Sequence, residues 1–219
     1  TYPVRAADGS GPQVLILHTH GTESYLPDGA DSYDEDESFR SENTEENVVA
    51  VGRVFADTLR GAGISVVHDE TMYFNAAYTS SRAAVYAWLE KYPSIRYVFD
   101  LHRDSVFTAD GENQKPVTEI NGETAAQIML VVGTDQGGAI HPNWKQNLTV
   151  AAAYQQILNT DYPTLARPVC LRTASFNQQC LPGMLLLEIG ACGNTLTEAK
   201  RAARLAALSF ISLYNASAS

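Results

Sequence analysis

Histidine and glutamate stand at the spacing of metal ligands directly after the first apolar run of the chain. Residues 18–23 read HTHGTE, in which His20 and Glu23 form a His-x-x-Glu pair. A second segment, DLHRDS at residues 100–105, supplies His102 from a separate apolar run. Three protein ligands leave the fourth tetrahedral position open, which a catalytic zinc ion needs for its water. These residue types therefore predict a Zn²⁺ site held by His20, Glu23 and His102.

A carboxylate within an apolar run adds the proton-transfer group that such a site needs. Glu188 interrupts the sequence LLLEIG at residues 185–190. Burial of a carboxylate is costly unless the group is paired or lies near a metal. We predict that Glu188 takes a proton from the attacking water and delivers it to a leaving amine, so the predicted reaction class is amide hydrolysis.

The other histidines and charged residues near these motifs have predicted supporting roles. Arg103 is predicted to be catalytic, by holding a substrate carboxylate or stabilising an oxyanion, and a surface ion pair is the alternative. Asp100 is expected to orient a ligating histidine. His18 is expected to be a core or supporting residue rather than a ligand, whereas His68 and His141 are expected to be ordinary loop residues.

Apolar runs alternate with helical patterns along the chain, which is typical of an α/β sheet covered by helices. Strands are predicted at residues 14–17, 64–67, 96–101, 117–120, 126–132, 169–171 and 184–189, and helices at 46–62, 81–92, 144–158 and 195–214. The dipeptide Asn121-Gly122 predicts a tight turn that joins the fourth and fifth strands as a hairpin. We expect a single-domain mixed, mostly parallel sheet, with residues 1–11 as an N-terminal extension and 12–219 as the catalytic domain.

The charge of the chain is acidic and unevenly distributed. Lys and Arg number 15 against 25 Asp and Glu, for a formal net charge of -10. Nine of the carboxylates lie between Asp28 and Glu46, where Arg40 is the one base. A solvated loop is the expected reading, and a substrate-facing loop at the rim of the site is the alternative. The basic residues do not cluster, so a nucleic-acid partner is not expected.

The cysteine content and the hydropathy of the chain indicate its redox environment and its relation to the membrane. The chain has three cysteines, Cys170, Cys180 and Cys192. Cys170 and Cys180 flank a short loop, and both a disulfide and two free thiols remain possible there. No apolar run reaches the ~18 residues that a membrane span needs, and no signal-peptide pattern is present.

Several motifs in the right order resemble the stage II sporulation protein P family. They are HTHGTESYLP at 18–27, NVVAVG at 47–52, DLHRDS at 100–105, LEIG at 187–190 and NTLTEA at 194–199. The resemblance implies an amidase-like fold that is shared broadly with zinc carboxypeptidases. It also implies a zinc-dependent N-acetylmuramoyl-L-alanine amidase that cleaves peptidoglycan between N-acetylmuramic acid and L-alanine, with a linked endopeptidase activity on peptide cross-links.

The same resemblance carries expectations about place, partner and site residues. Family members act outside the cytoplasmic membrane during engulfment of the forespore, in the intermembrane space, and usually carry an N-terminal membrane anchor. Their partner is a lytic transglycosylase, stage II sporulation protein D. This chain would then be a soluble extracytoplasmic fragment that lacks the anchor. The matching motifs assign the metal histidines to the HTH and DLHR segments and the catalytic position to Glu188.

Two questions stay open at the level of sequence. Related amidases take the metal carboxylate from the start of the helix after the first strand, where Glu45 and Glu46 stand. Glu23 is preferred because it is close to His20 and lies within the matching motif. The alternative functions are a non-catalytic cell-wall binding module and a zinc carboxypeptidase acting on free peptides.

Overall fold

The computed structural model describes residues 11–30, 39–74 and 76–218. The predicted N-terminal extension and the centre of the acidic run, residues 31–38, lie outside the described residues. The division of the chain into an extension and a catalytic domain therefore stays a prediction.

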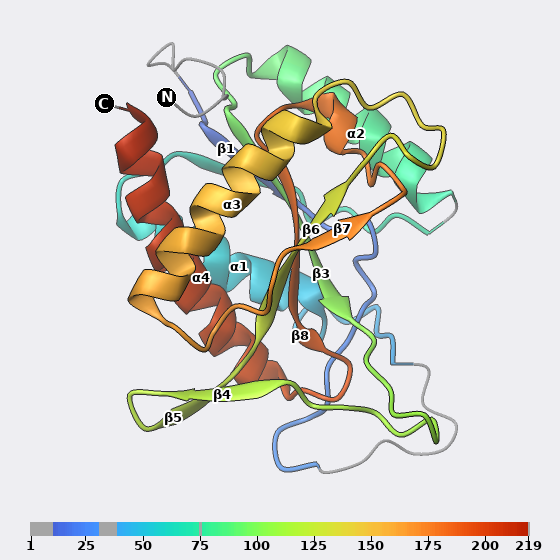
Figure 1. The fold of residues 1–219 in the computed structure, drawn as a ribbon, viewed down its shortest axis with the longest axis vertical. Helices are drawn as coiled ribbons and strands as arrows, with labels where there is room; N and C mark the ends of the chain where they lie inside the picture. The colour runs from blue at the N-terminus through green and yellow to red at the C-terminus, as the bar shows by residue number, and fades with distance from the viewer. Residues whose placement is uncertain (1–10, 31–38, 75, 219) are drawn as a thin grey trace.

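A six-stranded sheet forms the centre of the molecule (Figure 1). Its strands stand in the order β2-β1-β3-β8-β6-β7. Their bounds are Val66–His68, Val14–Leu17, Tyr97–Asp104, Met184–Ala191, Ile128–Gly133 and Cys170–Arg172. The first four are mutually parallel, and β6 runs antiparallel to β8 and parallel to β7. The prediction of a mixed, mostly parallel sheet flanked by helices is confirmed.

Helices cover both faces of this sheet (Figure 1). They are α1, Val48–Gly61; α2, Ala77–Lys91; α3, Trp144–Asp161; and α4, Leu196–Ala218. Val14 and Ile16 of β1 face the core formed with α1, α3 and α4, whereas Leu15 and Leu17 face the core formed with α2. Burial on both faces explains why the strand reads as a continuous apolar run.

The predicted hairpin is correct at its turn and wrong in its second arm. Strand β4, Val117–Ile120, pairs with β5, Glu123–Ala126, and the turn residues Asn121 and Gly122 have φ of 55° and 79°. The chain then leaves the hairpin at Gln127, whose N–H donates to Pro116 O at 2.9 Å, and enters β6. Residues 125–132 are apolar except for Gln127, so their composition gives little indication of this break between two strands.

The other boundaries differ from the predicted ones by a few residues, with one consequence for the site. Strand β3 continues to Asp104, three residues beyond its predicted end, so His102 and Arg103 lie within the strand. Their polar side chains resemble a loop in sequence, although the backbone still pairs with β8. The predicted capping box of α4 is confirmed, because Glu198 N–H donates to Thr195 Oγ1 and Thr195 N–H donates to Glu198 Oε2.

The cysteines and the hydropathy of the helices complete the description. Cys170, Cys180 and Cys192 are all free thiols in this structure. Among the described residues, no helix combines the length and the apolar character that crossing a membrane requires.

Candidate metal centre

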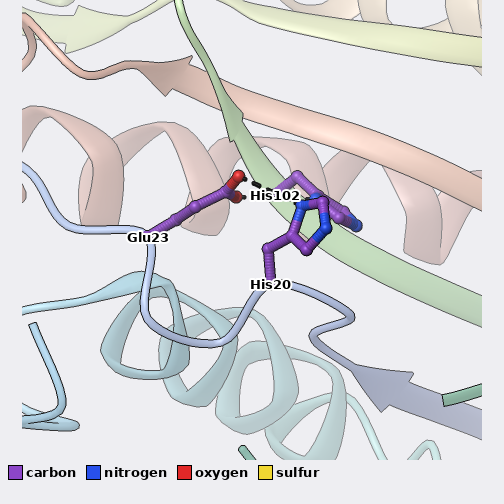
Figure 2. A group of neighbouring side chains, drawn as sticks. All are labelled: His20, Glu23 and His102. Carbon is purple, nitrogen blue, oxygen red and sulfur yellow. Dashed lines mark ion pairs between the residues drawn. The ribbon is translucent and has the colours of Figure 1, made fainter. Parts of the chain in front are cut away.

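Three side chains from the first loop and from β3 converge at the carboxyl end of the parallel strands (Figure 2). His20 Nδ1 lies 3.4 Å from Glu23 Oε1, and His102 Nδ1 lies 3.5 Å from Glu23 Oε2. One nitrogen or oxygen from each residue lies within 4.8 Å of those of the other two. The predicted trio is thus brought together, with one carboxylate facing two imidazoles.

The loop that carries His20 and Glu23 is held by neighbouring backbone. Glu23 N–H donates to His20 O at 3.0 Å, which closes a turn between the two side chains. Val48 N–H, at the start of α1, donates to Glu23 O at 2.8 Å. The side chain of Asn47 caps the same helix by accepting from Val49 N–H. The helix start and the metal-ligand loop therefore form one rigid unit.

Asp100 fixes the orientation of His102 from behind. This carboxylate is fully buried, and it accepts the N–H of Thr19 at 2.8 Å and the hydroxyl of Thr19 at 2.6 Å. His102 Nε2 lies 3.0 Å from Asp100 Oδ1. The opposite ring nitrogen, Nδ1, is consequently the one that faces Glu23. Such a carboxylate–histidine pair is the usual support of a metal-binding imidazole.

Electrostatics keep the carboxylates of the cluster ionised. Burial alone would raise the pKa of Glu23, but the hydrogen bonds from His102 and His20 outweigh it and hold that pKa well below its usual range. Burial likewise opposes the cationic form of His102, but the Asp100 and Glu23 carboxylates raise its pKa well above the ordinary value. The cluster is thus an anionic pocket that attracts a cation.

Glu188 stands beside this cluster on the neighbouring strand. It pairs in register with His102, and directly paired residues of adjacent strands point to the same face of a sheet. Burial raises the pKa of Glu188 to about 8. Its Oε2 atom is buried and has no hydrogen-bond partner among the described residues. The carboxyl group therefore has a high proton affinity and an oxygen available for chemistry.

Arg103 makes several hydrogen bonds within the protein, and its catalytic role stays a prediction. Its guanidinium donates to Ser24 O, Ser105 Oγ and Phe39 O, and its backbone N–H donates to Glu23 Oε2 at 3.1 Å. Arg103 is buried and holds the loop that carries Glu23 against β3.

One charged pair near the cluster was not predicted. Asp104 Oδ2 accepts from Arg167 Nη1 at 2.9 Å, and both groups influence the pKa of Glu188. Arg167 comes from the segment between α3 and β7. Only the order of the strands brings it to Asp104, so no local motif could have indicated the pair.

The alternative metal carboxylates lie outside the cluster. Glu45 forms an ion pair with Arg53, and Glu46 accepts from Ser41 Oγ at 3.1 Å and Asn43 Nδ2 at 2.8 Å. Both glutamates are exposed. In the described part of the chain, Glu23 is therefore the glutamate that faces both His20 and His102.

The remaining histidines are buried away from the cluster. His18 Nδ1 lies 3.0 Å from Leu101 O, and its Nε2 lies 2.8 Å from His68 Nε2. Burial, with the nearby His68, lowers the pKa of His18 to about 3, which agrees with its predicted core role. The expectation that His68 is an ordinary loop residue is wrong, because it ends β2 with a buried ring. His141 lies in a loop as expected, but it is buried there.

The donor set of the cluster fits zinc. Two imidazole nitrogens and one carboxylate oxygen are ligand types that zinc enzymes use, and the low pKa of Glu23 supplies the ionised form that a metal requires. Three protein ligands leave one position of a tetrahedral zinc site for a further ligand.

Comparisons of sequence identify relatives along almost the entire chain. The model of a family described as Stage II sporulation protein P matches residues 3–211. The protein named Stage II sporulation protein P from Bacillus subtilis (strain 168) is 29% identical over 228 residues. That match covers 97% of this chain and 53% of the relative, so the chain spans about half the length of the curated protein that it matches.

Comparisons of structure show the same fold in several amidases. The N-acetylmuramoyl-L-alanine amidase AmiC2 of Nostoc punctiforme aligns with a TM-score of 0.52 and 11% identity, covering 94% of this chain and 99% of its own. The CwlD amidase from Clostridioides difficile, solved in complex with the GerS lipoprotein, aligns with 0.53 and 12% identity, covering 93% and 99%. The catalytic domain of CwlV from Bacillus (Paenibacillus) polymyxa var. colistinus aligns with 0.53 and 10% identity, covering 93% and 98%.

Proposed function

The chain belongs to the stage II sporulation protein P family, and from this premise we propose that it is a zinc-dependent peptidoglycan hydrolase. Its proposed reaction is cleavage of the amide bond between N-acetylmuramic acid and the L-alanine of the stem peptide. The observation that carries the proposal is the convergence of His20, Glu23 and His102 beside Glu188, whose Oε2 has no partner among the described residues.

Each residue of the site has a role in this proposal. His20, Glu23 and His102 would hold the zinc ion, with His102 oriented by Asp100. A zinc ion in such a site lowers the pKa of a bound water and polarises the substrate carbonyl. Glu188 accepts the proton of the attacking water and then donates it to the leaving amine, for which its raised pKa is suited.

Arg103 is proposed to be a positioning residue. The contacts of its guanidinium with Ser24, Ser105 and Phe39 engage it with the protein itself. It therefore acts on the reaction by fixing Glu23, whose carboxylate also accepts the Arg103 N–H. Direct contact with the substrate is not needed for that role.

Finer features of the function are proposed from the family alone. They are a linked endopeptidase activity on cross-links, action outside the cytoplasmic membrane in the sporulating cell, and cooperation with a stage II sporulation protein D-type lytic transglycosylase. Residues 12–219 are proposed as the catalytic domain.

Removal and restoration of the metal tests the proposal. Purified peptidoglycan is incubated with the protein, and released stem peptides are separated and identified by mass. Activity is expected to vanish with a chelator and to return on addition of zinc. Chelator-resistant release would contradict the zinc mechanism. Wall binding without any product would instead support the binding-module alternative, and release of single residues from free peptides would support a carboxypeptidase.

Two matched variants test which glutamate holds the metal. Glu23→Gln is expected to weaken zinc binding by about 100-fold or more, because a neutral amide is a poor ligand. Glu45→Gln removes an exposed carboxylate from the alternative position and is expected to leave zinc affinity unchanged. Competition titration against a chromophoric chelator measures both. Weaker binding in the second variant alone would reassign the ligand.

A further inference from the structure

A cavity of about 230 Å³ lies between the start of α2 and the segment that follows β7. Tyr78 and Arg82 line it from the helix, and residues 174–177 line it from the other side. The cavity is separate from the three metal-ligand side chains, and the proposed reaction assigns it no role so far.

This cavity shares a wall with the metal centre. The ring of Tyr78 meets the ring of His20 edge-on, with centroids 5.3 Å apart. Phe176 packs on the far side of Tyr78 at 6.0 Å. A substrate whose scissile amide reaches His20 therefore needs only to pass Tyr78 to enter the cavity.

The cavity also has a cation that the protein leaves unpaired. Arg82 is exposed, and its guanidinium forms no hydrogen bond or ion pair within the described part of the chain. Its titratable neighbours are the neutral side chains of Tyr86 and Cys180, each with a raised pKa. In a chain with a net charge of -10, such a cation is conspicuous at the wall of a cavity.

A second cavity, which His20 helps to line, lacks an unpaired cation. It measures about 340 Å³ and is lined by Arg40, Thr22, Tyr73 and Phe74 among others. Arg40 Nη1 donates to Thr22 Oγ1 at 3.1 Å, so this guanidinium already has an acceptor. His20 thus lines the second cavity and contacts Tyr78 at the wall of the first, and an internal amide substrate has two arms that each need such space.

The wall of the first cavity is fixed in place. Asn177 Nδ2 donates to Tyr78 O at 2.7 Å and to Ser81 Oγ at 3.1 Å, which ties the loop to α2. The loop also packs closely on the end of β6, because a Cβ added to Gly133 would lie 2.3 Å from Ala174 O. A rigid, preformed wall is typical of a ligand pocket.

Hydrogen bonds connect this wall to Asp100, whose carboxylate lies within ion-pair distance of His102 in the metal centre. The hydroxyls of Ser81 and Thr19 are 2.8 Å apart, and Thr19 donates to Asp100, which faces His102. The contacts run unbroken from Asn177 at the cavity to a metal-binding imidazole. A group seated in the cavity is thus held in a defined position relative to the reacting centre.

We propose that this cavity binds the peptide arm of the substrate through a carboxylate, with Arg82 pairing the charge and Tyr78 and Phe176 packing against the aliphatic part. The proposal rests on the proposed amidase function. It assigns the peptide arm to the cavity with the unpaired arginine and leaves the second cavity to the sugar arm.

Paired substrates and variants test this assignment. Two soluble muramoyl-peptides are compared that differ only in whether the peptide carboxylates are free or converted to carboxamides. The zinc-loaded wild type is expected to prefer the free acid by about tenfold or more in kcat/KM, since only the free acid can form a charge-assisted hydrogen bond with Arg82. Arg82→Gln is expected to lose this preference by becoming slower on the free acid alone.

Arg204→Gln is the matched control. Arg204 is also an exposed arginine, but it lies on α4, on the opposite face of the sheet. It is expected to keep the preference of the wild type. Equal loss in both variants would assign the effect to overall charge and overturn the proposal, as would a preference retained by Arg82→Gln.

A binding measurement separates this proposal from the proposed function. Calorimetry with metal-free protein is expected to show weaker binding of the free acid to Arg82→Gln, by about tenfold, with no change for the carboxamide. If wild type hydrolyses neither substrate, the proposed amidase function fails, and the calorimetric difference still decides the cavity. If hydrolysis proceeds and no calorimetric difference is found, the cavity assignment fails alone.

Discussion

The carboxyl group of Glu188 combines a proposed role in proton transfer with a cost in stability. Its pKa in the folded protein is about 8, against an ordinary value of 4.5. Between these values the unfolded chain releases the proton while the folded chain retains it. The contribution of Glu188 to the free energy of unfolding therefore falls as pH rises from about 4.5 to about 8.

We expect Glu188→Gln to stabilise the metal-free protein in a pH-dependent way. Glutamine cannot ionise, so the gain over wild type should be small at pH ~5 and reach about 1–3 kcal/mol at pH ~8. Urea unfolding of both proteins at the two pH values, with chelator present, measures this. The same substitution should lower amide hydrolysis by about 10²–10⁴-fold.

An exposed glutamate provides the control for this prediction. Glu90 lies on the solvent side of α2, and Glu90→Gln is expected to change stability by the same small amount at both pH values. A gain for Glu188→Gln that is equal at pH ~5 and pH ~8 would show that ionisation of Glu188 is not the cause.

At the scale of single residues, the sequence predicts those parts of the site that lie within apolar runs or at their ends. His20, Glu23 and His102 could be selected because they are metal-ligand types that follow apolar runs. Glu188 could be selected because it is a carboxylate within an apolar run. The charged pair of Asp104 and Arg167 could not, nor could the wall formed by Tyr78 and Arg82. These contacts join segments that are remote in sequence, and only the folded topology makes them neighbours.

Helix α1 and the end of β1 approach each other unusually closely at Gly52. A Cβ at this position would lie 2.5 Å from His18 Cε1 and Nε2 and 2.9 Å from His68 Nε2. The His18 ring cannot easily yield, since it is buried and bonded to Leu101 O. A glycine in the middle of a helix is ordinarily a weakness, but here it permits the helix to lie against the two imidazoles.

We therefore expect Gly52→Ala to destabilise the protein by about 1–3 kcal/mol, although alanine is the better helix former by about 1 kcal/mol. Gly61→Ala, in the last turn of the same helix, is the control, because a Cβ there meets nothing within 4 Å. It should be neutral or stabilising. Denaturant unfolding of the two variants gives the comparison, and a stabilised Gly52→Ala would refute the close packing.

At the scale of elements, strong periodicity predicts position better than polar composition does. Strand β1 is predicted to the residue, and the predicted start of α3 at Trp144 is also correct. The end of β3 is missed because His102, Arg103 and Asp104 look like a loop, yet their backbone continues the ladder with β8. A strand whose last residues are polar functional side chains lacks, at that end, the apolar pattern by which strands are identified in a sequence.

The whole molecule is acidic, and the acid is concentrated in one stretch of the sequence. Asp34, Glu35, Asp36 and Glu37 lie there, and peptidoglycan is itself anionic. Repulsion between like charges should weaken wall binding at low salt and be screened as salt increases.

Neutralising these four carboxylates to asparagine and glutamine is expected to flatten the salt dependence of wall binding. Turnover of a small soluble substrate should change by less than about twofold, because none of these four carboxylates is a proposed metal ligand or proton-transfer group. Co-sedimentation with purified walls across a salt series measures the first quantity, and a soluble muramoyl-peptide assay measures the second. A collapse of turnover with unchanged salt dependence would assign the run to the reaction.

The order of the strands also governs how the molecule can be built during synthesis. The centre of the sheet is the parallel pair of β3 and β8, in which Val98 pairs with Met184 near the other end of the chain. A nascent chain that has completed β3 still exposes one edge of that strand, and unpaired edges favour aggregation. Contacts between distant segments also form slowly. The proposed site is therefore expected to be completed as a last step of folding, when β8 docks and brings Glu188 beside His102.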